Sequence, residues 1–228
     1  MTTSEHIAVA IDGPAASGKS SVARRLAARL GFTYVNSGAI YRAVTWFLLK
    51  SGVAVEDADA VRRALATLEL SCEAADGVSR ICINGEDPEA FLSSEEVNLN
   101  VSKVAAIAEV REILVGKLVA YRDIGHLVME GRDIGSVVFP DTPAKFYIDA
   151  SAEVRNARRR KQGLCDEIGE RDRHDRTRSA SPLVIPEDAV VIDSSEMGID
   201  EVVDEIHERL REKGILATAA SSDSSSSA

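Results

Sequence analysis

Residues 13–20 read GPAASGKS, which matches the pattern G-x-x-x-x-G-K-[ST] at every fixed position. Each fixed residue type has a chemical purpose in a loop that binds phosphate. Glycines let the backbone turn tightly and bring several N–H groups onto phosphate oxygens. Lys19 supplies a cation for the β- and γ-phosphates, and the hydroxyl of Ser20 suits a magnesium ligand. The pattern therefore predicts a nucleotide-binding loop.

The segments on either side of this loop have the patterns that such a loop requires. Residues 7–11 form an apolar run of strand length before it. Val22, Leu26 and Leu30 follow at helical spacing, so bound phosphates would lie at a helix N-terminus, where free N–H groups favour anions. This context disfavours the alternative of a glycine-rich turn with an exposed lysine.

Composition sets the outer limits on fold and partners. The chain has 228 residues, of which 45% are hydrophobic, enough for one domain with insertions. A formal charge of −10 argues against a general binder of nucleic acid or membrane surfaces. No apolar run approaches the roughly 20 residues that span a bilayer, and residues 1–6 carry no secretory signal. The three cysteines fit neither a zinc spacing nor an even disulfide set, so we expect a cytoplasmic protein.

Four further apolar segments have the length of buried strands, at residues 32–35, 127–130, 145–148 and 189–192. Helical patterns separate them, which predicts an open α/β sheet whose ligands gather at the carboxyl ends of the strands.

Residues 68–87 have a different pattern from the segments around them. Apolar and polar residues alternate there around a turn at residues 74–77, which predicts a β-hairpin in a small inserted subdomain. Cys72 and Cys82 would face each other within this hairpin.

Several polar residues follow predicted strands and suit an anion. The stretch NSGAIYR at residues 36–42 is one such strand end, although Ser37 is equally explained as a helix cap and Arg42 as a solvated charge. The stretch GRDIG at residues 131–135 is another, and the preceding Glu130 could hold a magnesium-bound water.

Two polar residues lie within a long helical pattern at residues 93–121. Ser102 and Arg111 are nine residues apart, so they do not share one face of a straight helix. A break near residues 105–108 would bring both towards one ligand; otherwise both are surface residues.

Residues 155–178 form the most basic segment of the chain. It holds eight arginines and one lysine against five acidic residues, a local charge of +4 in a chain of −10. Such a run usually marks a solvated face. Here it follows the fourth predicted strand of a phosphate-binding fold, and phosphoryl transfer needs cations over the transferring group. We therefore favour a basic lid.

Five blocks of the sequence resemble the bacterial cytidylate kinases, which belong to the nucleoside monophosphate kinases. The resemblance covers roughly residues 7–210, and the second and fourth blocks are the most diagnostic. The blocks are IDGPAASGKS, NSGAIYR, VSKVAA with VRE, EGRDIGSVVFP and ERDRHDRTRSASPL.

This resemblance implies a domain organisation and a reaction. The implied fold is a three-layer P-loop NTPase fold with a five-stranded parallel sheet over residues 1–214. It would carry a monophosphate-binding insertion at about 37–121 with a small antiparallel segment, and a short lid at about 158–178. Residues 215–228 would be a disordered Ser/Ala-rich tail. The implied reaction is Mg²⁺-assisted phosphoryl transfer from ATP to CMP or dCMP by a monomer with no nucleic-acid or membrane partner.

The resemblance also implies roles by motif position. Arg42, Arg132 and Arg178 would hold the CMP phosphate. Ser102, Arg111 and Asp133 would read cytosine, and Arg171 and Asp175 would contact the ribose. ATP would contact Gly13, Pro14, Ala15, Ala16, Ser17, Gly18, Lys19, Ser20, Ser21 and Arg158. The full CMP set adds Ser37 and Tyr41, the catalytic residues would be Lys19, Arg132, Arg171 and Arg178, and the metal would contact Ser20 and, through water, Glu130.

The chain departs from the family pattern at two points. The segment between Arg160 and Arg171 is about ten residues shorter than expected for the family's lid, and His174 stands where relatives often have arginine. A shorter lid would close less fully and admit water, so we expect raised ATP hydrolysis without CMP.

Two other classes of function stay open from the residues. One is a P-loop kinase for another acceptor, such as UMP, AMP, a shikimate-like compound or a sugar acid. The other is a non-catalytic nucleotide switch. The Asn-Lys-x-Asp tetrapeptide expected of a guanine-nucleotide switch does not occur in the sequence.

Overall fold

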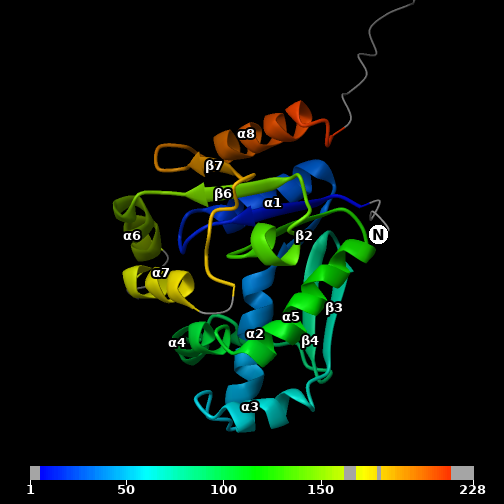
Figure 1. The fold of residues 1–228 in the computed structure, drawn as a ribbon, viewed down its shortest axis with the longest axis vertical. Helices are drawn as coiled ribbons and strands as arrows, with labels where there is room; N and C mark the ends of the chain where they lie inside the picture. Colours follow the sequence, from blue (N-terminus) through cyan, green and yellow to red (C-terminus); the bar gives the residue numbers. More distant parts are fainter. Residues whose placement is uncertain (1–5, 162–167, 179–180, 217–228) are drawn as a thin grey trace, which may run out of the picture.

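A single sheet forms the centre of the molecule, with strand order β3-β4-β2-β5-β1-β6-β7 (Figure 1). The computed structural model describes residues 6–161, 168–178 and 181–216, and for residues 72–75, 168, 170 and 171 it describes the backbone alone. Five neighbouring strands are parallel, which confirms the expected α/β fold with a five-stranded parallel sheet. These strands are β2 (Thr33–Asn36), β5 (Leu127–Gly131), β1 (Ala8–Asp12), β6 (Lys145–Asp149) and β7 (Val190–Asp193).

The expected hairpin forms and extends this sheet at its β2 edge. Strands β3 (Leu70–Ala75) and β4 (Val78–Ile83) are antiparallel, and β4 pairs in parallel with β2. The backbone N–H of Tyr34 donates to the carbonyl of Gly77 at 2.9 Å. The expectation that Cys72 and Cys82 face each other is wrong, because the register pairs Cys82 with Ser71 instead.

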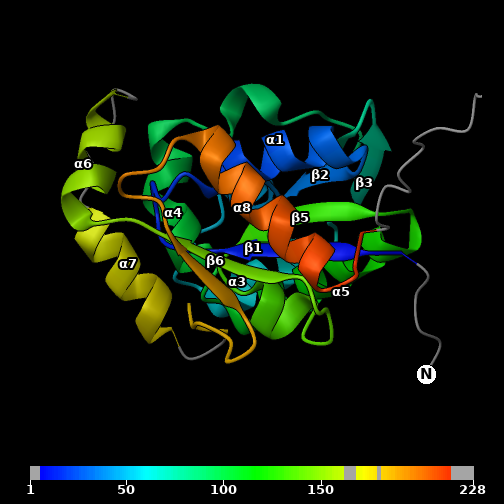
Figure 2. The same cartoon turned by 90° about the horizontal axis from the view of Figure 1, so that it is seen from above.

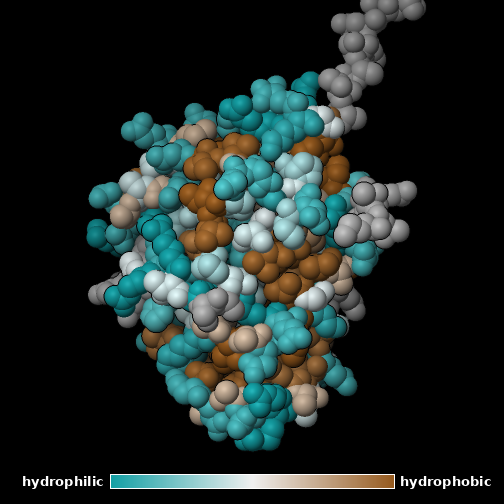
Figure 3. Space-filling view, in the orientation of Figure 1, coloured by the Kyte–Doolittle hydropathy of each residue, from teal (hydrophilic) through white to brown (hydrophobic). Residues whose placement is uncertain are grey.

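Helices cover both faces of the sheet because alternate residues of its central strands are apolar on both sides. In β1, Val9 and Ile11 pack in one apolar cluster, while Ala8 and Ala10 pack in another. The first cluster lies under α1 (Lys19–Leu30) and α8 (Ile199–Glu212), which pack together (Figure 2). Figure 3 shows hydrophilic residues over α8, as expected for a helix that buries only one side.

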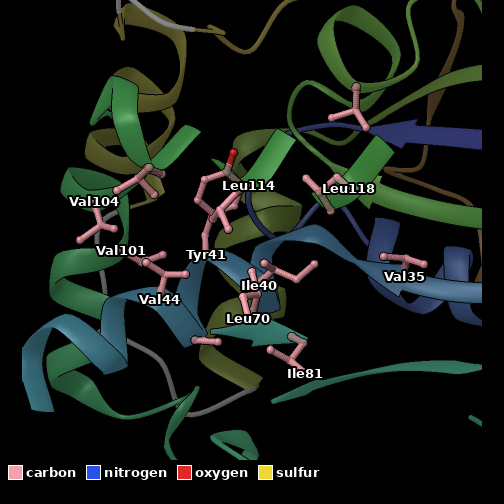
Figure 4. Close-up of a cluster of buried hydrophobic side chains, with 14 of the residues drawn as sticks. Val35, Ile40, Tyr41, Val44, Leu70, Ile81, Val101, Val104, Leu114 and Leu118 are labelled. Atoms are coloured by element: carbon pink, nitrogen blue, oxygen red, sulfur yellow. The ribbon is translucent and has the colours of Figure 1, made fainter. Parts of the chain in front are cut away.

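The second cluster joins three helices on the opposite face. Figure 4 shows Ile40 and Val44 of α2 (Ser37–Lys50) among side chains from two further helices. Those helices are α4 (Glu95–Val104), which contributes Val101 and Val104, and α5 (Ala108–Ala120), which contributes Leu114 and Leu118. Helix α4 ends at Val104 and α5 begins at Ala108, so the helix interruption that the sequence allowed near residues 105–108 is present.

The remaining elements are short. They are α3 (Ala58–Leu65), η1 (Glu89–Phe91), η2 (Tyr121–Asp123), the π-helical turn η3 (Ile134–Val138), α6 (Ala152–Lys161) and α7 (Ile168–Thr177). Helices α6 and α7 lie together beside the carboxyl ends of the strands (Figures 1 and 2). Within the described ranges, no helix is long and apolar enough to cross a membrane. Most of the predicted tail, residues 217–228, lies outside the described residues.

Candidate active site

A cavity of about 490 Å³ lies at the carboxyl ends of β2 and β5 and along the loop after β1. This volume is within the roughly 300–1,000 Å³ typical of small-molecule sites. Gly13, Pro14 and Arg111 are not on its wall. The side chain of Arg171 lies outside the described part of the chain. Every other predicted site residue lines the cavity, namely Ala15, Ala16, Ser17, Gly18, Lys19, Ser20, Ser21, Ser37, Tyr41, Arg42, Ser102, Glu130, Arg132, Asp133, Arg158, Asp175 and Arg178.

The loop after β1 has the backbone geometry that its glycines permit. A Cβ at Gly13 would lie 2.1 Å from the carbonyl oxygen of Ile148, so close approach to β6 requires glycine there. Gly18 has a φ of 94° and leads directly into α1. Lys19 Nζ donates to the carbonyl of Pro14 at 3.0 Å. The loop therefore holds its own ammonium group at the cavity wall.

Ser20 and Glu130 meet at one edge of this loop. Ser20 Oγ donates to Glu130 Oε1 at 2.8 Å, and Lys19 Nζ lies 4.0 Å from Glu130 Oε2. The hydroxyl of Tyr34 lies 3.4 Å from Glu130 Oε1, and burial raises the pKa of Tyr34, which keeps that hydroxyl protonated as a donor. One hydroxyl and one carboxylate are hard oxygen ligands, a set that suits Mg²⁺ when phosphates and water supply the others.

A buried carboxylate between two guanidinium groups forms the other side of the cavity. Asp133 pairs with Arg111 Nη2, and its Oδ1 lies 3.7 Å from Arg178 Nη2. Burial raises the pKa of Asp133, and the two arginines oppose that shift. Arg111 Nη1 also donates to the carbonyl of Ala105 at 3.1 Å, so this arginine satisfies the backbone at the break between α4 and α5.

Helix α7 contacts both sides of the cavity through two carboxylates. Asp175 Oδ2 accepts from Arg132 Nε at 2.7 Å. Asp172 Oδ1 accepts from the backbone N–H of Ala15 at 3.2 Å, and Asp172 also pairs with Arg155 of α6. The two aspartates are three residues apart and so share one helix face. Asp172 and Arg155 were not among the predicted site residues, since only spatial proximity distinguishes them within a charged segment.

Residues of α2 reach the cavity from the end of β2. The side chain of Asn36 accepts from the backbone N–H of Ala39 at 3.1 Å, so Asn36 is the helix cap and the capping alternative for Ser37 is wrong. Ser37 Oγ instead donates to the carbonyl of Glu130 at 2.8 Å. Arg42 is half-buried on the cavity wall rather than fully solvated.

Three buried polar atoms at the cavity have no hydrogen-bond partner within the described residues. They are Ser17 Oγ, the Tyr41 hydroxyl and Arg178 Nη2. Burial raises the pKa of Tyr41 to about 12, so its hydroxyl is protonated at neutral pH. Leaving such groups without a hydrogen bond costs roughly 1–3 kcal/mol each, so these atoms are available to a polar ligand or to water in the cavity.

One stretch of the cavity wall was missed by the sequence reasoning. Residues after β7 line the cavity next to Arg158, whose Nη1 donates to the carbonyl of Ser17 at 3.0 Å and whose Nη2 donates to the carbonyl of Ser194 at 2.8 Å. Ligands gather at the carboxyl ends of the strands in such sheets, and the same reasoning applied to the fifth predicted strand would have found this stretch. Its lining residues are Ser194, Met197, Gly198, Ile199 and Val202.

The sheet, the glycine-bent loop and the helix that follows it define a P-loop nucleotide-binding protein of the α/β class. A family model described as cytidylate kinase matches residues 9–212. The cytidylate kinase of Clostridium botulinum is 41% identical over 212 residues, covering 88% of this chain and 96% of its own. That of Nocardia farcinica is 42% identical over 221 residues, covering 90% and 94%. The chain belongs to the cytidylate kinase family.

Solved structures of other kinases are only distantly similar to this chain. The shikimate kinase from Acinetobacter baumannii, in complex with shikimate, is 13% identical with a TM-score of 0.47, covering 93% of this chain and 97% of its own. That likeness is too weak to bear on the substrate.

Proposed function

We propose that this protein transfers the γ-phosphoryl group of ATP to CMP or dCMP, giving ADP and CDP or dCDP. The observation that carries the proposal is that one cavity is lined both by the phosphate loop with Lys19 and by the Arg132–Asp133 pair. Two anionic nucleotides can therefore meet with their phosphates between fixed cations. The names of the family and of the relatives at 41% and 42% identity support cytidylate as the acceptor.

The donor nucleotide would bind along the phosphate loop. Backbone N–H groups at the start of α1 would hold its phosphates, with Lys19 at the β- and γ-phosphates. Arg158 borders the same end of the cavity, together with Met197, Gly198, Ile199 and Val202. Apolar side chains beside a guanidinium plane would suit a purine base.

The acceptor would bind on the opposite wall. Arg42, Arg132 and Arg178 would hold its phosphate, because a planar guanidinium binds phosphate through two parallel hydrogen bonds. Asp133 and Ser102 would face cytosine, whose exocyclic amine is a donor that a carboxylate accepts. Arg111 lies behind Asp133 and would act on the base through that carboxylate.

The chemistry needs no strong general base, because the acceptor is already an anionic phosphate. An oxygen of the CMP phosphate attacks the γ-phosphorus, and the bond to the β-phosphate oxygen breaks to release ADP. Lys19 and the arginines stabilise negative charge on the transferring group in the transition state. Helix α7 lines the cavity through Asp175, and its packing there would limit the access of water to that group.

Ser20 and Glu130 fit Mg²⁺ as a partner of ATP. Ser20 Oγ and Glu130 Oε1 are joined by a hydrogen bond of 2.8 Å. One ion could therefore contact the hydroxyl directly and the carboxylate directly or through water. When bound, Mg²⁺ neutralises charge on the donor phosphates.

A coupled assay of ADP release tests the proposal. With ATP and Mg²⁺ present, CMP and dCMP should each sustain turnover. A preference for UMP or AMP over CMP would overturn it.

A further inference from the structure

Asp12 is a buried carboxylate that neither the motif nor the proposed mechanism uses. It is the last residue of β1 and directly precedes Gly13 of the phosphate loop. Only 2% of its surface is exposed. Its Oδ1 accepts from the backbone N–H of Ile134 at 2.9 Å, and its Oδ2 accepts from that of Gly135 at 2.8 Å. Both oxygens of one side chain therefore serve two consecutive backbone donors.

These two donors begin the turn η3 and have no acceptor inside it. The backbone bonds of η3 run from Val137 and Val138 to the carbonyl of Asp133, and from Phe139 to the carbonyl of Ile134. The first N–H groups of any helical turn need an external acceptor. Asp12 supplies it from the neighbouring strand, so it caps η3 across a chain separation of more than a hundred residues.

Only Arg132 and Asp133 lie between β5 and η3. On the strand side, Asp12 is the register partner of Gly131. On the helix side, the carboxylate of the same Asp12 holds Ile134 and Gly135. One residue thus fixes the backbone on both sides of the two residues that face the acceptor.

We propose that Asp12 is a positioning residue, which sets the Arg132–Asp133 pair at a fixed place relative to the phosphate loop and so controls the affinity for the acceptor nucleotide. The inference rests on the proposed function. Asp12 touches neither substrate, and it acts through the backbone of the acceptor-binding residues. Its loss should therefore weaken CMP binding selectively, because the phosphate loop keeps its own backbone contacts with β6 and Arg158.

The test compares the affinities of wild type and Asp12→Asn for two probes by calorimetry. One probe is CMP alone, and the other is the non-hydrolysable ATP analogue β,γ-imido-ATP with Mg²⁺. Asparagine keeps one acceptor but turns an NH₂ group towards the second backbone N–H. At about pH 8.5, where Asp12 is ionised, we expect the affinity for CMP to fall about tenfold, as when a hydrogen bond to a charged group is lost. The affinity for the analogue should change less than about twofold.

Thr142→Val is the matched control. Thr142 is also buried, and its hydroxyl donates to the carbonyl of Ala8 at 2.6 Å, at the opposite end of β1. This variant should be less stable, with both affinities kept. If Asp12→Asn does not fold, Gly135→Ala is the second variant. Its Cβ would press on Lys145 Cγ at 3.2 Å, beside Asp12 Oδ2 at 3.4 Å, and so shift the turn that Asp12 holds.

The outcomes separate the two proposals. A loss of CMP affinity at least threefold greater than that of the analogue supports the positioning role. If the wild type binds CMP but the two losses differ by less than this, the positioning role of Asp12 is overturned and the proposed function is not. Failure of the wild type to bind CMP overturns the proposed function and this inference with it.

Discussion

Arg132 and Asp175 form an ion pair across the cavity, with Nε 2.7 Å from Oδ2. The pair joins the end of β5 to α7 and is mostly buried. Asp175 also lies 3.9 Å from Arg178, so one carboxylate of α7 faces two of the guanidinium groups proposed for the acceptor phosphate. An acceptor phosphate must therefore share these arginines with Asp175 or displace it, and the geometry of the guanidinium fork decides which hydrogen bonds form.

Arg132→Lys keeps the charge but removes the planar fork. We expect kcat/KM for CMP to fall about 100-fold, the usual effect of losing one preorganised contact to a transferring group, while KM for ATP changes less than about twofold. Steady-state kinetics at varied CMP and ATP measures both values. Arg25→Lys is the control, because Arg25 is exposed on α1 and pairs with Asp200. Full activity of Arg132→Lys would show that charge alone suffices.

Lys19→Ala removes the ammonium that the phosphate loop holds against Pro14. We expect turnover to fall at least about 100-fold, because one preorganised charge contact to the transferring group is commonly worth that much. The measurement is kcat at saturating CMP and ATP, with Lys50→Ala as an exposed control on α2. Retained turnover would mean that Lys19 does not contact the phosphates.

Glu130→Gln should raise the Mg²⁺ concentration needed for half-maximal activity. The substitution replaces the carboxylate that accepts from Ser20 with an uncharged amide, which should bind Mg²⁺ more weakly. Losses of about tenfold or more in metal affinity are typical of such changes. A titration of activity against Mg²⁺ measures the shift, and a chelator should abolish activity. Glu112→Gln, on an exposed position of α5, is the control. An unchanged Mg²⁺ requirement would remove Glu130 from the proposed metal site.

The free energy of unfolding should depend on pH through the ionisation of Asp12. Burial, aided by the nearby charge of Asp133, raises the pKa of Asp12 from 3.8 to about 7, although the N–H groups of Gly135 and Ile134 and the charge of Arg132 oppose the shift. Between pH 4 and 7 the folded state therefore binds a proton that the unfolded state has released. The free energy of unfolding contributed by Asp12 falls as pH rises through this interval, by at most about 1.4 kcal/mol per pH unit.

Urea unfolding of wild type and Asp12→Asn at pH 5 and pH 7.5 tests this sign. Relative to the variant, the wild type should be more stable at pH 5 than at pH 7.5. A difference that does not change with pH would show that Asp12 has an ordinary pKa in the folded protein.

If residues 158–178 form a short lid, as the sequence resemblance implies, ATP hydrolysis without an acceptor should have a measurable rate. The segment that would be missing falls next to residues 162–167, which lie outside the described residues. Release of ADP with ATP alone, compared with release in the presence of CMP, measures the uncoupled rate. A negligible uncoupled rate would show that the short segment excludes water as well as a longer one.

The local patterns of the sequence predicted the phosphate loop and the parallel sheet correctly. The loop around Lys19 and the five parallel strands have strong, short-range signals, since glycine spacing and apolar runs depend only on neighbouring residues. Ser37 and Arg111 had no such signal. Their partners, Glu130 and Asp133, are 93 and 22 residues away, so spacing left a helix cap or a surface residue open, and only the resemblance to a family favoured a site.

The contacts that cross the chain could not be predicted from spacing. Asp12 looks like the polar end of a strand, and its partners are 122 and 123 residues away. Asp172 looks like one charge among many, yet it accepts from the backbone of Ala15. The hairpin was placed correctly, but the one-residue offset of Cys72 and Cys82 depends on turn geometry that alternation does not determine.

The central claim is that cations fixed around one cavity bring an ATP phosphate and a cytidylate phosphate together. The most direct measurement is the rate of ADP release from ATP and Mg²⁺ with CMP, dCMP, UMP, AMP or no acceptor. The proposed site predicts that CMP and dCMP give the highest kcat/KM. A higher kcat/KM with UMP or AMP, or a rate with CMP no greater than that without acceptor, would contradict it.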